Sequence, residues 1–441
     1  MSRPGTGFEL HRSVPTRREF LQVSAGIAAA SFIAGCSQPS SSASGSSGGT
    51  LTLGLTSDLF PALTAPLAAY SRQGKWKVTV REMPADTGTY LDQIRTQLQA
   101  GSTDIDVFAG DVSWPAQLGS RGWIANIGDR FSPSERNAYL PATIASNTYK
   151  GSLYGVPFFT DVGLLYYRKD LLEKSGFSAP PSTWGELQDM AMKVTKDQNI
   201  PHGFTFTGAN YEGGTLLGME FIRSAGGNVI QGDSVTADSN SAIQGLQIAR
   251  SMVTSGVSPQ VVADYQEGDA EAPFVNGKAV FLRNWAYVFG DLENKTVSSI
   301  HPSQVGVTGI PRLSPAIAPS NVGGGWNLYI NAASQHRDAA WDLVKFISSA
   351  AQQRQTAQTI GYRPTRTALY QDAELIKTQP AIAQARTEIA QTVTPPVSPY
   401  YEDMSHAMSK EFNASLRGAE TPEQAAQNVQ QQLEAIVKAG S

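Results

Sequence analysis

Four segments of the chain place aromatic side chains beside small, acidic or amide side chains, at positions that we predict to be loops. They are Asp111–Trp114, Phe158–Asp161, Asn284–Tyr287 and Gly323–Asn327. An aromatic ring can cover the apolar face of a sugar, while a carboxylate or amide exchanges hydrogen bonds with its hydroxyl groups. A single tryptophan of this kind is more often a core residue, and Asp111 alone could cap a helix. Four such segments together favour a site that binds carbohydrate.

The motifs that mark many catalytic and cofactor sites are absent. The sequence has no H-E-x-x-H motif, P-loop or G-x-G-x-x-G motif. Its five histidines are scattered, and none has another histidine three or four positions away. We therefore expect no metal, no cofactor and no enzyme activity. An exported glycoside hydrolase stays open as an alternative, because Asp111 and Asp161 could pair in space without any fixed spacing in sequence.

The first 50 residues have the pattern of an export signal followed by a tether. An arginine pair, Arg17–Arg18, precedes an apolar stretch over 23–33, and Ile33–Cys36 matches a bacterial lipobox. The stretch is too short to span a bilayer, which takes about 20 residues. We predict a twin-arginine-type signal peptide over 1–35, lipidation at Cys36 and a Ser/Gly-rich tether over 36–50.

Composition is consistent with a globular protein held at a membrane surface. Cys36 is the only cysteine of 441 residues, which excludes a disulfide framework. The predicted signal holds four of the 34 basic and two of the 38 acidic residues, so the remaining chain has a net charge of −6. Such a balance excludes nucleic acid as a partner. Only 16% of residues are charged, against about 25% in an average soluble domain.

These candidate loops must be positioned by a sheet. Strand patterns over 51–55, 77–80 and 106–109 alternate with helical patterns over 63–70 and 90–100, which predicts a parallel sheet. Thr183 and Glu186 form a capping box that opens a helix in a mostly helical middle region. Further elements are expected at 216–225, 242–255, 305–307, 328–330, 338–349 and 422–439. Loss and return of strand character predicts an α/β chain with two lobes and a ligand cleft between them.

Several motifs resemble those of a known family. The run 155–172 (GVPFFTDVGLLYYRKDLL) closely resembles a signature of bacterial extracellular solute-binding proteins, the sugar-binding type that serves ABC importers. The segments 111–115, 274–279 and 398–401 resemble the same family. The resemblance implies a type II periplasmic-binding-protein-like fold with several hinge crossings. It also implies a monomer that delivers its ligand to permease subunits with a separate ATPase.

The resemblance also implies lobe boundaries and site residues. It places 51–158 plus 309–355 in lobe 1, and 159–308 plus 356–441 in lobe 2. Asp111 and Asp161 match aspartates that bind sugar hydroxyls in relatives, and Trp285 matches a stacking platform. The remaining candidates are Gly325 and Trp326 in a loop that closes over the ligand, together with Asn284, Trp114 and Asp58.

Two departures from the family pattern leave the ligand open. Relatives that bind disaccharides often have a glutamate after the first strand, where this chain has only Asp58. They also often have an arginine before the run 396–401, where this chain has Pro395. A glycerophosphodiester or an amino sugar is therefore an alternative ligand, with Arg283 and Arg363 available for a phosphate. An adhesin or structural lipoprotein is a further alternative.

Overall fold

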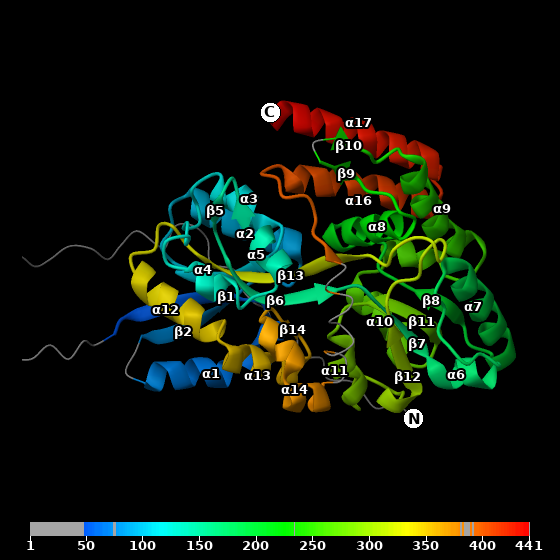
Figure 1. The fold of residues 1–441 in the computed structure, drawn as a ribbon, viewed down its shortest axis with the longest axis horizontal. Helices are drawn as coiled ribbons and strands as arrows, with labels where there is room; N and C mark the ends of the chain where they lie inside the picture. The colour runs from blue at the N-terminus through cyan, green and yellow to red at the C-terminus, as the bar shows by residue number, and fades with distance from the viewer. Residues whose placement is uncertain are drawn as a thin grey trace, which may run out of the picture. The chain divides into compact units, whose positions relative to one another are not determined.

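The computed structural model describes residues 48–73, 76–232, 234–379, 382, 389 and 392–440. These residues belong to one compact unit, Ser47–Ser441. Its longer strands form two separate sheets, each covered by helices (Figure 1). None of the described helices is both long and apolar enough to cross a membrane.

The first sheet has the strand order β14-β6-β13-β3-β1-β2, with β15 beside β13. Its strands are β1 (Thr50–Leu55), β2 (Lys77–Glu82), β3 (Val107–Asp111), β6 (Val156–Val162), β13 (Asn321–Ile330), β14 (Arg363–Pro364) and β15 (Thr392–Val393). As predicted, β1 pairs in parallel with both β2 and β3. The sheet as a whole is mixed, because β13 runs antiparallel to β3 and β6.

Both faces of the first sheet are apolar and covered by helices. Successive strand residues point to opposite faces, so Val107 and Ala109 enter one core cluster while Phe108 enters another. The first cluster lies under α1 (Phe60–Arg72) and α12 (Arg337–Ile347), with α13 (Ala350–Ile360) beside α1. The second lies under α2 (Thr87–Gln99) and α3 (Trp114–Gly119). We call this sheet and its helices the first lobe.

The second sheet has the strand order β12-β7-β11-β8. Its strands are β7 (Leu164–Arg168), β8 (His202–Thr205), β11 (Ala279–Asn284) and β12 (Val305–Thr308). The aromatic rings of Trp184, Phe204 and Phe221 pack together in its core. The predicted capping box is present, with Thr183 and Glu186 exchanging hydrogen bonds at the start of α7 (Trp184–Gln198).

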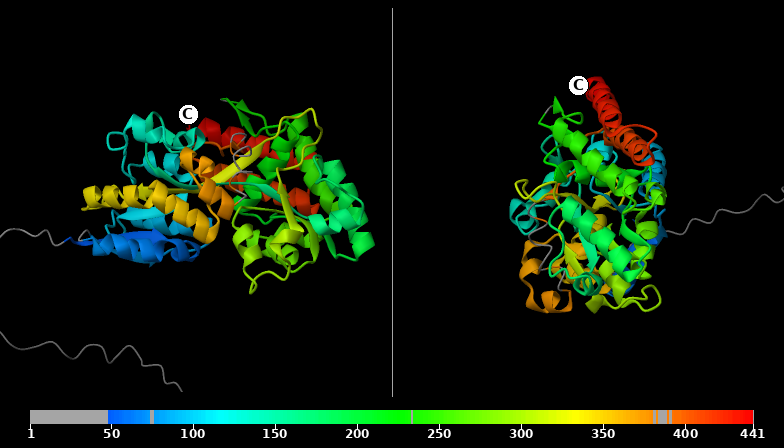
Figure 2. Two further views of the ribbon diagram at one scale, coloured as in Figure 1. Left: turned by 60° about the horizontal axis from the view of Figure 1, so that its bottom comes forward. Right: turned by 90° about the vertical axis from the view of Figure 1, so that its right-hand side faces the viewer.

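Four helices complete the second lobe. They are α8 (Glu212–Ser224), α9 (Asn240–Thr254), α16 (Tyr401–Arg417) and α17 (Pro422–Gly440). The two C-terminal helices, red in Figure 2, lie against α8 and α9. Helix α8 begins four residues before the predicted helix at 216–225. The start of the helix was predicted too late because Gly213 and Gly214 lie in its first turn, and glycine disfavours helices.

The chain crosses directly between the sheets at Gly163. This residue alone separates β6 of the first sheet from β7 of the second. A Cβ atom at Gly163 would lie 2.0 Å from Glu220 Oε2 and 2.5 Å from Arg283 Nη2, so no larger residue fits there without rearrangement. The chain returns between β12 and β13. Short connections at such crossings are the natural hinges of a two-lobe protein.

The remaining elements connect these layers. The helices are α4 (Pro133–Arg136), α5 (Pro141–Ser146), α6 (Lys169–Lys174), α10 (Glu267–Val275), α11 (Val288–Glu293) and α14 (Ala373–Thr378). The 3₁₀ helices are η1 (Ser57–Leu59), η2 (Gln260–Asp264), η3 (Pro302–Gln304) and η4 (Thr367–Gln371). The short strands are β4 (Thr148–Tyr149), β5 (Ser152–Leu153), β9 (Ile230–Gln231) and β10 (Ser234–Val235).

Candidate ligand-binding cleft

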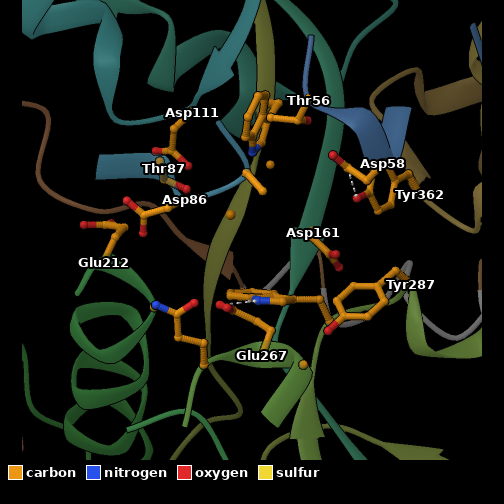
Figure 3. A pocket seen from close by; sticks show the side chains of 18 of the residues that line it. Thr56, Asp58, Asp86, Thr87, Asp111, Asp161, Glu212, Glu267, Tyr287 and Tyr362 are labelled. Carbon is orange, nitrogen blue, oxygen red and sulfur yellow. Dashed lines mark hydrogen bonds between the residues drawn. The ribbon is translucent and has the colours of Figure 1, made fainter. Parts of the chain in front are cut away.

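A cavity of about 560 Å³ opens where the two lobes meet. The first lobe lines it with residues that follow β1 or end β3, and with the middles of β6 and β13. The second lobe lines it with the loop after β11 and the first turns of α8 and α10. This volume is in the range of small-ligand sites. Figure 3 shows acidic and aromatic side chains entering the cavity from both sides.

Six of the eight predicted ligand-binding residues line this cavity. They are Asp58, Asp111, Asp161, Trp285, Gly325 and Trp326. The structure does not bring Asn284 and Trp114 to it. Asn284 is fully buried, donates to the Glu267 carbonyl oxygen at 3.0 Å and accepts from the Trp285 backbone N–H at 2.8 Å. Trp114 is buried against Tyr90 and lines a neighbouring cavity of about 220 Å³.

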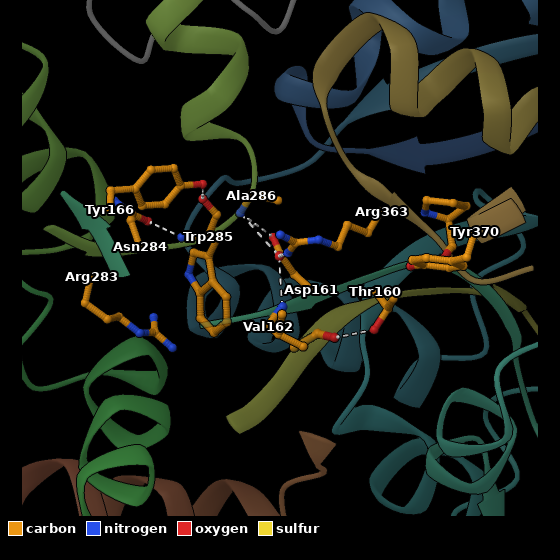
Figure 4. A network of polar contacts seen from close by, with 12 residues as sticks. Thr160, Asp161, Val162, Tyr166, Arg283, Asn284, Trp285, Ala286, Arg363 and Tyr370 are labelled. Carbon is orange, nitrogen blue, oxygen red and sulfur yellow. Dashed lines mark hydrogen bonds and ion pairs between the residues drawn. The ribbon is translucent and has the colours of Figure 1, made fainter. Parts of the chain in front are cut away.

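Asp161 lies at the centre of a buried polar network (Figure 4). Its Oδ1 accepts hydrogen bonds from Arg363 Nη1 at 2.7 Å and from the Val162 backbone N–H at 2.9 Å. The Ala286 backbone N–H lies 3.3 Å from both carboxylate oxygens. Burial raises the pKa of Asp161, and Arg363 opposes that rise. The carboxylate therefore ties β6 to β14 and to the loop that carries Trp285.

Trp285 lines the cavity, and its contacts with neighbouring side chains hold the ring in place. The guanidinium of Arg283 lies 4.1 Å from the centre of the Trp285 ring. Arg283 in turn donates from Nε and Nη2 to the two Glu220 oxygens, both at 2.7 Å, in a pair that is 1% exposed on each side. A cation over an indole ring is attractive. The buried pair thus supports the ring from behind.

A second aromatic wall belongs to the first lobe. The rings of Trp326 and Phe159 stack with an interplanar angle of 13° and centres 6.3 Å apart. Phe159 also stacks on Tyr362, with centres 4.2 Å apart, and the Tyr362 hydroxyl donates to Asp58 Oδ2 at 2.6 Å. The wall depends on Gly325, whose φ of +120° favours glycine. Trp326 and Trp285 thus give each lobe one indole at the cavity.

The structure does not bring to the cavity the two arginines that were predicted to be available for a phosphate ligand. Arg283 and Arg363 are both buried, and neither lines the cavity. Each is paired with a carboxylate, Arg283 with Glu220 and Arg363 with Asp161. Both arginines are only 1% exposed. Strand pairing and lobe contact bury them.

Four carboxylates that sequence reasoning missed also line the cavity, namely Asp86, Glu212, Glu267 and Asp291. Asp86 caps α2 by accepting from the Thr89 backbone N–H at 2.7 Å, and Glu212 and Glu267 lie in the first turns of α8 and α10. Acidic residues at helix starts are common for structural reasons. No feature of the sequence therefore distinguished these three as site residues.

Glu212 is the most perturbed of these acids. Its Oε1 accepts from the Tyr401 hydroxyl at 2.7 Å, and Ser405 donates to its other oxygen. Burial, followed by the negative charge of Asp111, raises the pKa of Glu212 to about 8. Burial also raises the pKa of Asp111. Two acids from opposite lobes therefore interact across the cleft.

Comparison with known proteins places this fold and cleft in a family. A family model described as bacterial extracellular solute-binding protein matches residues 66–384. The chain belongs to this family. A probable ABC transporter-binding protein of Deinococcus radiodurans is 31% identical over 379 residues, which cover 83% of this chain and 88% of the relative.

Solved structures agree with the family assignment. Maltose-bound T. maritima MalE3 is 34% identical, with a TM-score of 0.82, and the match covers 88% of this chain and 99% of that protein. The GacH receptor of Streptomyces glaucescens has a TM-score of 0.78 at 21% identity, covering 89% of this chain and all of the receptor, which is a likeness of fold alone. The predicted two-lobe α/β fold is confirmed. Solute-binding proteins of this family act outside the cytoplasm. The predicted signal peptide and Cys36 lie outside the described residues.

Proposed function

We propose that this protein captures a saccharide between its two lobes and delivers it to the permease of an ABC importer. The observation that carries the proposal is the pair of indoles, Trp285 from one lobe and Trp326 from the other, in a cavity rich in carboxylates. Indole faces suit the apolar faces of sugar rings, and carboxylates suit their hydroxyls. The maltose bound by the 34% identical relative supports the same ligand class.

Transport requires that ligand binding change the arrangement of the two lobes. A ligand that contacts both lobes favours their closed arrangement by the difference in its affinity for the two arrangements. The sequence predicts 51–158 plus 309–355 as lobe 1, and 159–308 plus 356–441 as lobe 2. The two sheets support two lobes, but β6 runs to Val162 and β14 pairs with it in the first sheet, so we propose that 159–162 and β14 belong with lobe 1. The crossing at Gly163 is a hinge in this proposal.

No bond is made or broken in this proposal. A glycoside hydrolase needs one carboxyl group that acts as an acid and a second that is free to attack or to activate water. Asp161 is engaged by Arg363 and two backbone N–H groups, which disfavours either role. Release of nitrophenol from aryl glycosides, abolished by Asp111→Asn, would overturn the transport function in favour of hydrolysis.

The Trp285 platform provides the direct test of ligand binding. We expect saccharides to raise the melting temperature in a concentration-dependent way, by mass action on the native state. Trp285→Ala removes one platform and should weaken binding by about 2 kcal/mol, or roughly 30-fold. Trp285→Phe keeps a ring and should keep most of the affinity. Equal affinity in the wild type and Trp285→Ala would contradict the proposed site.

We further propose that the mature protein is a monomer anchored through a lipid on Cys36. Its partners are the permease and a separate ATPase, and no nucleotide-binding motif occurs in this sequence to suggest ATP hydrolysis by the chain itself. Cys36→Ser should move the protein from the membrane fraction to the soluble extracytoplasmic fraction. Retention of Cys36→Ser in the membrane fraction would refute anchoring at this residue.

A further inference from the structure

The lining of the cleft carries negative charge without matching positive charge. Seven carboxylates line it: Asp58, Asp86, Asp111, Asp161, Glu212, Glu267 and Asp291. Among the residues that the structure describes, no lysine, arginine or histidine lines it. Within that same part of the chain, only Asp161 of the seven has an ion-pair partner, Arg363. A neutral ligand would leave the other six acids without an ion-pair partner.

The contacts of these acids satisfy hydrogen bonds but do not neutralise charge. Asp58 accepts from a tyrosine hydroxyl, and Glu267 accepts from the Tyr211 hydroxyl and faces the Trp285 Nε1 at 3.4 Å. Hydroxyl donors leave the full negative charge in place. Because the cleft walls are protein, that charge is screened less than it would be in open water.

Three carboxylates gather at one end of the cleft, which we call the acidic end: Asp86, Asp111 and Glu212. Figure 3 shows them on the same side of the cavity, with Asp58 and Tyr362 on the other side. Asp86 and Asp111 come from the first lobe and Glu212 from the second. Asp86 and Glu212 also line the neighbouring cavity of about 220 Å³, so the acidic end lies where the two cavities meet.

Two of these acids, Asp111 and Glu212, interact with each other. Asp111 is only 8% exposed, accepts from the Ser113 backbone N–H at 2.9 Å and has no ion-pair partner in the described part of the chain. The raised pKa of Glu212 reflects its burial and the charge of Asp111. Ionised together, the two acids repel each other as the lobes approach. A cation between them would convert this repulsion into an attraction that holds the lobes together.

Basic side chains of the described residues do not neutralise this end. Arg95 of α2 forms an ion pair with Glu402 of α16. His406 of α16 lines the neighbouring cavity, not the cleft. In the described residues, no three acidic, histidine or cysteine side chains are arranged to hold a metal ion. An organic cation fits this end better than a metal ion does.

We propose that the ligand is a saccharide bearing a protonated amine, which lies between Asp111 and Glu212 while sugar rings contact Trp326 and Trp285. This inference rests on the proposed function, since it specifies the ligand class of the same cleft. The cavity and its two indoles identify the site, and the unmatched carboxylates specify the charge of what enters it. An ammonium group donates to carboxylates with charge assistance, which hydroxyl groups cannot do.

The test compares neutral disaccharides with counterparts in which one or two hydroxyl groups are replaced by amines, with the purified full chain in calorimetric titrations at pH 7. The matched pairs are cellobiose with its di-glucosamine counterpart, and trehalose with 2-amino-2-deoxytrehalose. We expect the amine to bind at least ten-fold more tightly in at least one pair, and this preference should fall as salt is added. Glu212→Gln and Asp111→Asn should each reduce the preference to less than three-fold.

Asp104→Asn is the matched control, because it removes an exposed carboxylate of the first lobe that does not line the cleft. It should leave the amine preference within two-fold of the wild type. If Asp111→Asn does not fold, Glu212→Gln still decides the question, since a glutamine can retain the contact with Tyr401. Equal or tighter binding of the neutral sugar in every pair would overturn the inference and leave the proposed function standing. If no saccharide of either kind binds, the proposed function itself fails.

Discussion

Removal of the Arg363 charge should destabilise the protein in a way that depends on pH. Arg363→Met keeps much of the side-chain volume but leaves Asp161 with backbone donors only. Breaking one side of a buried ion pair costs about 3–5 kcal/mol. At about 2.1 cal/mol/K per residue over roughly 395 residues, this corresponds to a fall in melting temperature of about 4–6 °C.

The pH dependence separates lost charge from lost packing. Arg363 lowers the pKa of Asp161, whereas burial raises it. In Arg363→Met the pKa of Asp161 should therefore rise further, and the carboxyl group becomes neutral as pH falls. A neutral Asp161 needs no counter-charge, so the deficit in melting temperature should be largest at pH 8 and should shrink toward pH 5.

The assay is differential scanning fluorimetry of the wild type and variants from pH 5 to pH 8. Arg366→Met is the matched control, because Arg366 donates to the Ser348 carbonyl and the Tyr139 hydroxyl instead of a carboxylate. Its deficit should not depend on pH. Adding Asp161→Asn to Arg363→Met should recover part of the lost stability. A deficit below 1 °C at pH 8, or one that is equal at pH 5 and pH 8, would refute this account of the pair.

Two further predictions concern the cleft walls. Gly325→Ala should lower the melting temperature by about 1–4 °C, from a strain of roughly 1–3 kcal/mol, because the new Cβ would lie 2.5 Å from Phe159 O. Gly324→Ala should not lower it, since its nearest neighbour is a Trp285 ring atom at 3.6 Å; equal effects of the two would contradict the prediction. Burial raises the pKa of both Glu212 and Glu271 to about 8. Between pH 4.5 and pH 8 these groups would be ionised in the unfolded chain and protonated in the folded one. The melting temperature of the ligand-free protein should therefore fall as pH rises from about 4.5 to 8. Glu212→Gln should make the melting temperature depend less steeply on pH, and an unchanged slope in this variant would contradict the prediction.

Several site residues could be predicted because each lies in a local pattern that needs no partner. Asp111 ends a buried strand, and Trp326 follows a run of glycines in a strand. Strand ends and Gly-rich segments bring backbone and side chains to ligands in most α/β folds. The predicted strands and helices were recovered for the same reason, since hydrophobic periodicity is a property of neighbouring residues.

Side-chain direction was harder to predict than residue type. Asn284 and Trp285 are neighbours in one predicted loop, yet the asparagine is buried and the tryptophan lines the cavity. Asn284 is still the last residue of β11, and successive residues leave a strand in opposite directions. Trp114 begins α3, where its ring packs on Tyr90. A difference of one residue in where a strand ends decides which side chain the ligand meets.

The sequence by itself determined the elements with clear hydrophobic periodicity and marked Asp111, Asp161, Trp285 and Trp326, because these signals are encoded over a few neighbouring residues. It was wrong to place Phe158–Asp161 and Gly323–Asn327 in loops, since they lie within β6 and β13. Only the tertiary structure decided the charge of the cleft. Glu212, Asp86 and Asp291 come from separate elements, and Arg363 meets Asp161 from 202 residues away. Electrostatic energy depends on distance in space and on burial. Which acids are neutralised and which face the ligand therefore emerges only when the two lobes are assembled.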